Sequence, residues 1–471
     1  MPFFDAHKLE PWAHGKWTNI PRKRIRGFSI DARKIDDGEL FVAVKAVRDG
    51  HDYIKQAKEA GARGAIVDRF VEAVELPQLI VQDTVESLQE IAKNHRNQCN
   101  IPIVGITGSC GKTSTKEALS KLLPDSLSTL GNLNNHLGVP LTLLRIDSSV
   151  HQYGIIEAGI NKTGDMDELQ QMIQPNCLII TMIGSSHLQG LVDENGVAEE
   201  KIKLWTNAEK SHWAFFPEHC LTFKCFQEAI KERQNYTILK AGKPNKKIDQ
   251  NEAFFEISTK TNELGGSCVL RIWCHESPVL SLNIPAVSDG MGSNLALAVL
   301  AALYLGISDK DIFERLPQYR PSTLRGNRLQ GRGCEYFVDC YNANPASMVD
   351  SIQYFQRASD SKKKLLVLGG MEELGENGPS LHRQTGASIS LEEQDKVVLI
   401  GEKASWMADG LIDSGASDHQ VLVLNKLEDA RAIVEDFNGN ILFKGSRSNS
   451  LEKLVPFWAT ESHQDHLFLK C

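Results

Sequence analysis

The chain has 471 residues, of which 41% are hydrophobic and 24% charged, and its formal net charge is −8. This composition is typical of a globular protein with an ample core, and the negative charge argues against a general nucleic-acid binder. The longest apolar stretch, 295–307, is too short to span a bilayer, so we expect no integral membrane segment.

The ten cysteines are scattered along the chain, and none forms a Cys-x-x-Cys motif. A zinc site is therefore a poor expectation, and we interpret the cysteines as reduced thiols. Residues 1–8 contain no apolar signal core. These features predict a cytoplasmic protein, and we expect it to be a monomer.

The chain order predicts three α/β domains. In the first, 1–98, a strand at 40–44 precedes a helix at 53–60 that stops at Gly61. Strands at 65–67 and 79–81 follow, and a helix is expected from about 85 to 95.

The central domain, 99–318, begins with the apolar run 101–106, and its strands alternate with helical segments as a parallel sheet requires. Short alternating runs between 254 and 285 predict an antiparallel portion of this sheet. The polar, lysine-rich stretch 235–251 is expected to be a solvated loop.

The third domain, 319–471, is expected to be a Rossmann-like, doubly wound sheet. Its predicted strands are 336–338, 365–368, 397–400, 421–424 and 441–443.

A glycine-rich turn joins the strand at 101–106 to a helix and has the sequence Thr107-Gly-Ser-Cys-Gly-Lys-Thr113. It departs from the strict phosphate-loop pattern because Ile106 stands where a glycine would be. Its backbone N–H groups can still face anionic oxygens, and the helix start adds a positive end. A nucleoside triphosphate such as ATP is therefore the expected ligand. The residues assigned to it are Gly108, Ser109, Cys110, Gly111, Lys112 for the phosphates and Thr113 for Mg²⁺.

Two further side chains follow strand ends of the same sheet. Glu157 ends the strand at 154–157, and His187 follows the strand at 177–182. Ligands gather at the carboxyl edge of a parallel sheet, so Thr113, Glu157 and His187 could share magnesium with ATP. Mg²⁺ prefers oxygen, so spacing alone leaves His187 open between a metal ligand and a surface or adenine contact. Lys201, taken alone, is interpreted as a solvated lysine on a charged helix.

Several segments, in the right order over nearly the whole chain, resemble the Mur ligase family of ATP-dependent, peptide-bond-forming enzymes. The similarity is greatest to the branch that adds D-alanyl-D-alanine to a UDP-linked muramoyl tripeptide in peptidoglycan synthesis. The segments are 107–113, Gly131 to Pro140, Glu157-Ala-Gly159, 183–188, Asp339 to Met348, Glu373-Leu-Gly375 and Lys444-Gly-Ser-Arg447, with 31–33, 38–43 and 49–51 near the N-terminus.

The resemblance implies that the first domain holds the UDP-sugar and the central domain holds ATP. The third domain would then close the site. It also implies two Mg²⁺ ions served by Thr113, Glu157, His187 and a carbamylated Lys201. On the same basis, the nucleotide would contact Asn294 on the adenine side, Arg328 at the phosphates and Asp339 at the ribose. The implied substrate residues are Asp31, Arg33, Asn134, Asn135, Asn342, Asn344, Lys444 and Arg447.

Four sites depart from the usual pattern of the family. Ala32 replaces a serine, and Lys203 stands where a glutamate is common. Gly370 replaces an aspartate, and Gly290-Met291 replaces a His-Asn pair just before Asn294.

The alternatives are a sibling ligase or a folylpolyglutamate-synthase-like enzyme that adds another amino acid. From a different class, a nucleotide-dependent regulatory binder or a relative that has lost activity would also use the phosphate loop. The Tyr341-Asn-Ala-Asn-Pro345 run argues against the folate branch, and the set Glu157, His187 and Lys201 is more than a switch needs.

Overall fold

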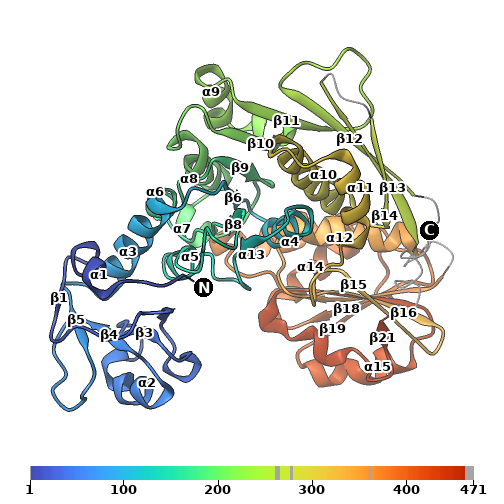
Figure 1. Ribbon diagram of the computed structural model, residues 1–471. Helices are drawn as coiled ribbons and strands as arrows, with labels where there is room; N and C mark the ends of the chain where they lie inside the picture. The colour runs from blue at the N-terminus through green and yellow to red at the C-terminus, as the bar shows by residue number, and fades with distance from the viewer. Residues whose placement is uncertain (1, 260–265, 276–278, 360–361, 462–471) are drawn as a thin grey trace.

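The computed structural model describes residues 2–259, 266–275, 279–359 and 362–461. It contains three sheets, one in each of three α/β domains that follow one another along the chain. In Figure 1 the N-terminal domain lies at the lower left, the central domain at the top and the C-terminal domain at the lower right. Within the described residues, no helix has both the length and the apolar character that crossing a membrane requires.

The N-terminal domain is a five-stranded sheet in the order β1-β5-β4-β3-β2, parallel except for β1. Its helix α3 begins at the N-cap Asp83, which accepts hydrogen bonds from the backbone of residues 85 and 86. The elements are α1 Ala6–Trp12, β1 Lys16–Trp17, β2 Gly27–Ser29, β3 Glu39–Val42, α2 Ile54–Ala60, β4 Gly64–Val67, β5 Gln78–Ile80 and α3 Thr84–Gln98.

Helix α3 also joins this domain to the next one. Leu88 and Ile91 of α3 belong to a hydrophobic core that continues into the central domain through Val139 and Met166. Arg96, near the end of α3, donates hydrogen bonds to the backbone carbonyls of Ile173, Gln174 and Cys99. The two domains therefore share one core.

The central sheet has nine strands in the order β14-β13-β12-β11-β10-β9-β6-β8-β7. Strands β6 to β12 pair in parallel, and β12, β13 and β14 pair antiparallel, which confirms the predicted antiparallel portion. The strands are β6 Ile103–Thr107, β7 Ser126–Ser128, β8 Tyr153–Glu157, β9 Cys177–Ile180, β10 Trp213–Pro217, β11 Tyr236–Ala241, β12 Glu252–Thr259, β13 Ser267–Cys274 and β14 Leu280–Pro285.

The central helices lie on both sides of this sheet (Figure 1), and α10 is almost entirely apolar and buried, as its sequence predicts. The helices are α4 Lys112–Leu122, α5 Gly138–Leu143, α6 Asp165–Ile173, α7 Leu188–Leu191, α8 Glu194–Thr206, α9 Lys224–Glu232, α10 Asp289–Tyr304 and α11 Asp309–Arg315.

The prediction of a solvated loop over 235–251 is wrong for its first part. Residues 236–241 form β11, which lies between β10 and β12, and residues 237–239 are buried. The lysines that suggested a loop come mostly after Ala241. The apolar run Thr237-Ile-Leu239 is what pairs and packs.

The C-terminal sheet has the order β19-β18-β17-β20-β16-β15-β21, with β19 to β16 parallel and β15 and β21 antiparallel. Apolar clusters cover both faces, as a doubly wound sheet requires. The elements are β15 Asn327–Gly331, β16 Cys334–Asp339, α12 Pro345–Ala358, β17 Lys364–Gly369, α13 Gly378–Ala387, β18 Lys396–Ile400, α14 Glu402–Asp413, β19 Val421–Leu424, α15 Arg431–Asp436, β20 Asn440–Lys444 and β21 Thr460–Glu461.

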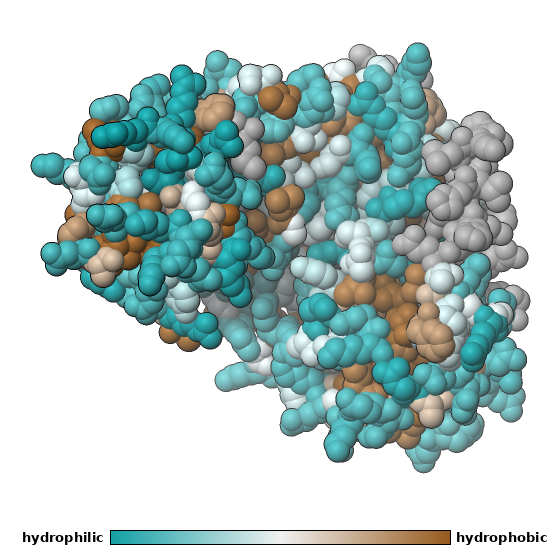
Figure 2. Space-filling model, turned by 60° about the horizontal axis from the view of Figure 1, so that its bottom comes forward, coloured by the Kyte–Doolittle hydropathy of each residue, from teal (hydrophilic) through white to brown (hydrophobic). Residues whose placement is uncertain are grey.

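Hydrophilic residues cover most of the face drawn in Figure 2, and a recess separates the left lobe from the lower right lobe. Nine cysteines among the described residues are free thiols, in agreement with the predicted reduced state, and Cys471 lies outside the described residues.

Candidate active site

A cavity of about 1030 Å³ lies between the central and C-terminal domains. Its walls come from the glycine-rich loop, the end of β8, the first turn of α10 and the carboxyl ends of β16 and β20. These are the edges of two open parallel sheets where ligands gather. The volume is that of a site for a nucleotide or another small substrate.

The glycine-rich loop forms one end of this cavity. Gly111 has φ +82° and starts α4, and a Cβ there would lie 2.5 Å from the amide nitrogen of Asn294, so only glycine fits. Lys112 bends back over the loop and its Nζ donates to the carbonyl of Gly108 at 2.7 Å. Burial lowers the pKa of Lys112, and Glu157 opposes that shift. The loop is thus arranged as an anion site at a helix start.

Other loop residues are held by the strand next to them. The Ser109 hydroxyl donates to the carbonyl of Gly184 at 2.8 Å, and Thr181 donates to the carbonyl of Cys110. The Cys110 thiol lies 2.9 Å from the sulfur of Met182, and burial raises its pKa to about 11. Cys110 is therefore a neutral thiol at neutral pH rather than a nucleophile.

Glu157 is the most connected carboxylate of the site. Its oxygens accept hydrogen bonds from the Thr113 hydroxyl at 3.1 Å and from the Asn134 amide at 2.8 Å. The Lys116 ammonium lies 3.4 Å from it, and both side chains are at most 4% exposed. The structure thus brings Thr113 and Glu157 together, as the sequence predicted.

His187 lines the same cavity and adopts a left-handed conformation, with φ +55°. Its Nδ1 lies 2.6 Å from Oε2 of Glu373 in the C-terminal domain, and the hydrogen bond lowers the pKa of that glutamate. The backbone N–H of Leu188 also donates to the carbonyl of Glu373. His187 is therefore part of the junction between two domains as well as of the cavity wall.

Lys201 lies on α8 and is completely buried, so its interpretation as a solvated lysine is wrong. Its Nζ has no hydrogen-bond partner in the described part of the chain. Burial, with a smaller contribution from the positive charge of Lys112, lowers its pKa well below the ordinary value. The side chain does not line the cavity, and its burial favours the neutral form of the amine.

The C-terminal domain contributes the ends of two adjacent strands. Lys444 on β20 donates to Oδ2 of Asp339 and to the carbonyl of Asn342, each at 2.9 Å. The amide of Asn344 donates to the carbonyl of Ser109 at 3.4 Å, which ties α12 to the phosphate loop. The Arg328 guanidinium donates to the Tyr354 hydroxyl at 2.7 Å. All five polar residues Lys444, Asp339, Asn342, Asn344 and Arg328 line the cavity.

Five predicted residues do not line this cavity: Asp31, Arg33, Gly108, Lys201 and Arg447. Asp31 and Arg33 form an ion pair at 2.9 Å in the N-terminal domain, and the hydrogen bond from Arg33 lowers the pKa of Asp31 to about 2. Arg447 forms an ion pair with Glu452. Asn134 and Asn135, by contrast, line it, and Asn135 also accepts hydrogen bonds from the first turn of α5.

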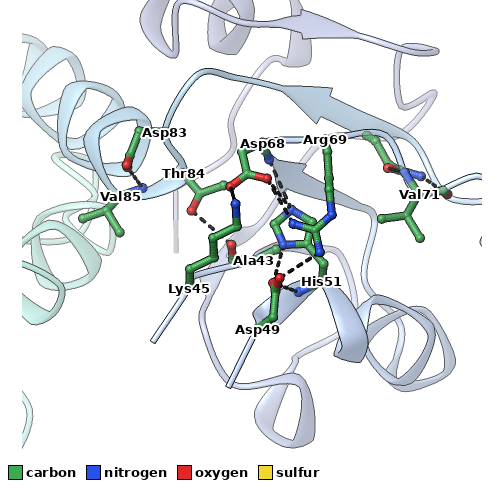
Figure 3. A network of polar contacts seen from close by, with 11 residues as sticks. Ala43, Lys45, Asp49, His51, Asp68, Arg69, Val71, Asp83, Thr84 and Val85 are labelled. Carbon is green, nitrogen blue, oxygen red and sulfur yellow. Dashed lines mark hydrogen bonds and ion pairs between the residues drawn. The ribbon is translucent and has the colours of Figure 1, made fainter. Parts of the chain in front are cut away.

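A second polar network lies in the N-terminal domain and is shown in Figure 3. Buried His51 contacts Asp49 through Nδ1 at 2.6 Å, and its Nε2 accepts the backbone N–H of Asp68 at 3.2 Å. Lys45 pairs with Asp68 and Arg69 pairs with Asp49. The network holds residues 45–51 against the end of β4, on the segment that the resemblance assigns to the UDP-sugar.

Three family models match the chain in order: "Mur ligase family, catalytic domain" at 24–96, "Mur ligase middle domain" at 106–302 and "Mur ligase, glutamate ligase domain" at 325–447. The UDP-N-acetylmuramoyl-tripeptide–D-alanyl-D-alanine ligase of Escherichia coli is 30% identical over 93% of this chain and 96% of its own length. The chain belongs to the Mur ligase family. It is thus an ATP-dependent ligase that forms peptide bonds.

Two more relatives support the family assignment. The ligase of the same name from Bacillus subtilis is 29% identical over 92% of each chain. A crystal structure of MurF from Acinetobacter baumannii superimposes with a TM-score of 0.85 at 28% identity, and covers 96% of this chain and 98% of its own. The three-domain α/β architecture predicted from the sequence is confirmed by this similarity.

Two residues of the Mur ligase site were not singled out by sequence reasoning. Lys116 contacts Glu157, and its position four residues after Lys112 on one helix face was the available signal. Asp350, on α12 of the C-terminal domain, contacts the start of α10, and no sequence motif predicts this contact.

The structure explains two departures from the family pattern. Lys203 bonds to Asp167 at 2.7 Å and to Glu200 at 2.8 Å, so it ties α8 to the start of α6. At Gly370 a Cβ would lie 2.7 Å from the Cβ of Lys403, which leaves no room for an aspartate. Ala32 is buried, and nothing in the structure explains its replacement of a serine.

Proposed function

We propose that the chain joins the terminal carboxyl group of a UDP-linked muramoyl tripeptide to the amine of D-alanyl-D-alanine, at the expense of ATP. The names of its relatives from Bacillus subtilis and Escherichia coli support this, because both names describe that ligase. The observation that carries the proposal is a single cavity that holds the phosphate loop, the Thr113–Glu157 pair and the strand ends of the C-terminal domain. That arrangement suits a reaction that needs ATP and two further substrates.

The chemistry follows from the weakness of a carboxylate as an electrophile. An oxygen of the tripeptide carboxylate attacks the γ-phosphorus of ATP, and the bond to the bridging oxygen breaks to release ADP. The resulting acyl phosphate is attacked by the dipeptide amine, the amine loses a proton, and phosphate leaves. Both steps depend on positioning and charge neutralisation more than on covalent chemistry by the protein.

The residues suited to that task are those at the loop. Lys112 and the backbone N–H groups of 110–113 face the phosphates from the start of α4, whereas the N–H of Ser109 donates to the carbonyl of Met182. Arg328 supplies a further cation and Asp339 holds the ribose, whereas Asn294, expected on the adenine side, lies beside Gly111 of the phosphate loop. Groups held in this way by the fold would stabilise developing charge with little reorganisation.

Magnesium fits the donor set of this site. The described residues contain no group of three His, Cys, Asp or Glu side chains arranged to hold a metal ion. A metal would therefore rely on Glu157, the Thr113 hydroxyl and the ATP phosphates, with His187 beside them, and oxygen ligands of this kind suit Mg²⁺. Bound there, Mg²⁺ would neutralise charge on the transferring phosphoryl group.

Carbamylation of Lys201 fits the same site. A buried, unpartnered Nζ with a lowered pKa is a neutral amine, which can add CO₂ and release a proton to become a carbamate. The carbamate would supply the oxygens that a second Mg²⁺ needs. Isotope-labelled bicarbonate followed by NMR should show a carbamate carbon signal that the Lys201→Arg variant lacks. A signal of equal strength in both proteins would contradict the assignment.

The two organic substrates would approach from opposite domains. Asp31 and Arg33 lie in the domain assigned to the UDP-sugar, and Asn134 and Asn135 line the path to the phosphates. For the incoming dipeptide we propose the C-terminal residues Asn342, Asn344, Lys444 and Arg447. We further propose that the chain acts as a monomer in the cytoplasm, where its free thiols would stay reduced.

The deciding experiment is mass analysis of the product formed from ATP, UDP-linked tripeptide and D-alanyl-D-alanine. We expect a UDP-linked pentapeptide and one equivalent each of ADP and phosphate. Parallel reactions with single amino acids test a sibling ligase, and reactions without either peptide test a nucleotide-dependent regulator. Phosphate release that ignores both peptides would refute the proposal.

A further inference from the structure

Asp350 carries a carboxylate from the C-terminal domain to the first turn of α10 in the central domain. Its Oδ2 accepts the Ser288 hydroxyl at 2.6 Å, and its Oδ1 accepts the backbone N–H of Gly290 at 2.9 Å. A Cβ at residue 290 would lie 2.7 Å from Oδ2, so the glycine leaves the space that this carboxylate occupies. Gly290 and Asp350 thus depend on each other across the domain junction.

Among the described residues, the Asp350 carboxylate is not paired with a cationic side chain. No lysine or arginine among the described residues forms an ion pair with Asp350, and burial raises the pKa of its carboxyl group. Each of its oxygens accepts one protein donor and has a second lone pair to offer. A half-buried carboxylate in this state gains most from a hydrogen-bond donor on a ligand.

Asp350 lines the nucleotide cavity, at some distance from the phosphates. Asn294 of α10 lies beside Gly111 of the phosphate loop. Ser288, six residues earlier in the chain, is the N-cap of the same helix. At a rise of about 1.5 Å per residue, Gly290 and Ser288, which the carboxylate contacts, lie roughly 6 to 9 Å further along the helix. With the triphosphate on the loop, that end of the cavity receives the nucleoside.

We propose that Asp350 selects the nucleobase of the triphosphate by accepting a hydrogen bond from an exocyclic amine, as adenine presents at N6. A base with a carbonyl at this position, as in guanine or hypoxanthine, offers an acceptor and faces the carboxylate unfavourably. This inference rests on the proposed function and adds to it the residue that distinguishes ATP from other triphosphates.

The test compares ATP with ITP, in which a carbonyl replaces the amine at position 6 and N1 carries a hydrogen. Wild-type protein should favour ATP in kcat/KM by about tenfold or more, as expected for a hydrogen bond to a charged group. In Asp350→Asn the amide can still accept from Gly290 and can donate to the carbonyl of ITP. The ATP/ITP ratio should therefore fall at least about tenfold.

Titration calorimetry with ADP and IDP gives a readout that needs neither peptide, and the same fall in the ratio of dissociation constants is expected. The matched control is Asp289→Asn, which removes the 2.9 Å contact with Arg357 across the same junction and does not line the nucleotide cavity. Its base preference should equal that of wild type.

An equal loss for both nucleotides in Asp350→Asn would overturn the proposal and leave Asp350 as a cap of α10. If Asp350→Asn changes the preference for ATP over 2′-deoxy-ATP, the carboxylate contacts the sugar, and the proposal is also overturned. Normal ADP binding with no peptide ligation would instead refute the proposed function and leave this assignment standing.

Discussion

His187 and Glu373 face each other across the junction between the central and C-terminal domains, with Nδ1 and Oε2 2.6 Å apart. Both residues have positive φ, +55° and +62°, although neither is a glycine. Backbone in this region is unfavourable for such residues and persists where surrounding contacts impose it. The pair therefore contributes to closure of the junction between the two domains.

Replacing Glu373 by Gln should loosen this closure modestly. The side chains are 22% and 55% exposed, so the contact is screened by solvent and contributes about 1 kcal/mol or less. We expect up to about a fivefold loss of kcat/KM, and a larger fraction of open molecules in small-angle scattering. The control is Glu372→Gln, whose partners Lys403 and Ser448 lie in the same domain. If Glu372→Gln loses as much kcat/KM as Glu373→Gln, closure does not depend on the His187–Glu373 pair.

Lys112→Ala should abolish turnover and leave the fold intact. Among the described residues, the side chain's hydrogen bond goes to the loop carbonyl of Gly108, so its loss removes a phosphate charge without opening the core. Phosphate release and circular dichroism together check this expectation. Normal ligation by the variant would show that the loop is not the ATP site.

Lys116→Met should destabilise the protein by about 3–5 kcal/mol, because it leaves the buried carboxylate of Glu157 without its cation. The double variant Lys116→Met/Glu157→Gln should regain most of that stability, since both charges are gone, and should remain inactive. Urea unfolding measures the first quantity and phosphate release the second. A double variant as unstable as the single one would mean that packing, rather than charge, sets the cost.

His382 should make stability fall in acid. It is fully buried, accepts the N–H of Met371 through Nε2 and donates to the carbonyl of Gly378, and burial lowers its pKa. Between the lowered folded pKa and the unfolded value of about 6.5, the unfolded chain binds more protons, so stability decreases as pH falls through this window.

His382→Gln should flatten that pH dependence by up to about 1.4 kcal/mol per pH unit. The replacement can still accept from the backbone N–H of Met371 but cannot titrate. Urea unfolding over a pH series is the measurement, with the exposed His419→Gln as control. Parallel curves for wild type and His382→Gln would assign the acid sensitivity to other histidines.

The sequence alone predicts the sheets and the phosphate loop well, because both are local patterns. The run Thr107 to Thr113 fixes its own conformation through glycines and a helix start, and apolar runs such as 441–443 mark buried parallel strands. The strand β11 was missed because its polar neighbours dominate the local composition. The segment forms a strand because it pairs with β10 and β12.

Contacts between domains could not be predicted in this way. Asp350 is sixty residues from Gly290 along the chain, and the two residues come into contact only because the folded chain brings α12 to the start of α10. Likewise, Lys201 looks solvated in a charged helix, and only the packing of α8 against the sheet shows that its amine is enclosed.

The shared core around α3 has a consequence for the acceptor. Leu88 and Ile91 pack with residues of the central domain in one continuous cluster, whereas the C-terminal domain has separate clusters of its own. The shared core therefore fixes Asp31 relative to the phosphate loop independently of the third domain. If the proposed UDP-linked peptide is anchored in the N-terminal domain, a peptide one residue shorter or longer should place its carboxyl group at a different distance from the phosphates, and we expect it to react more slowly.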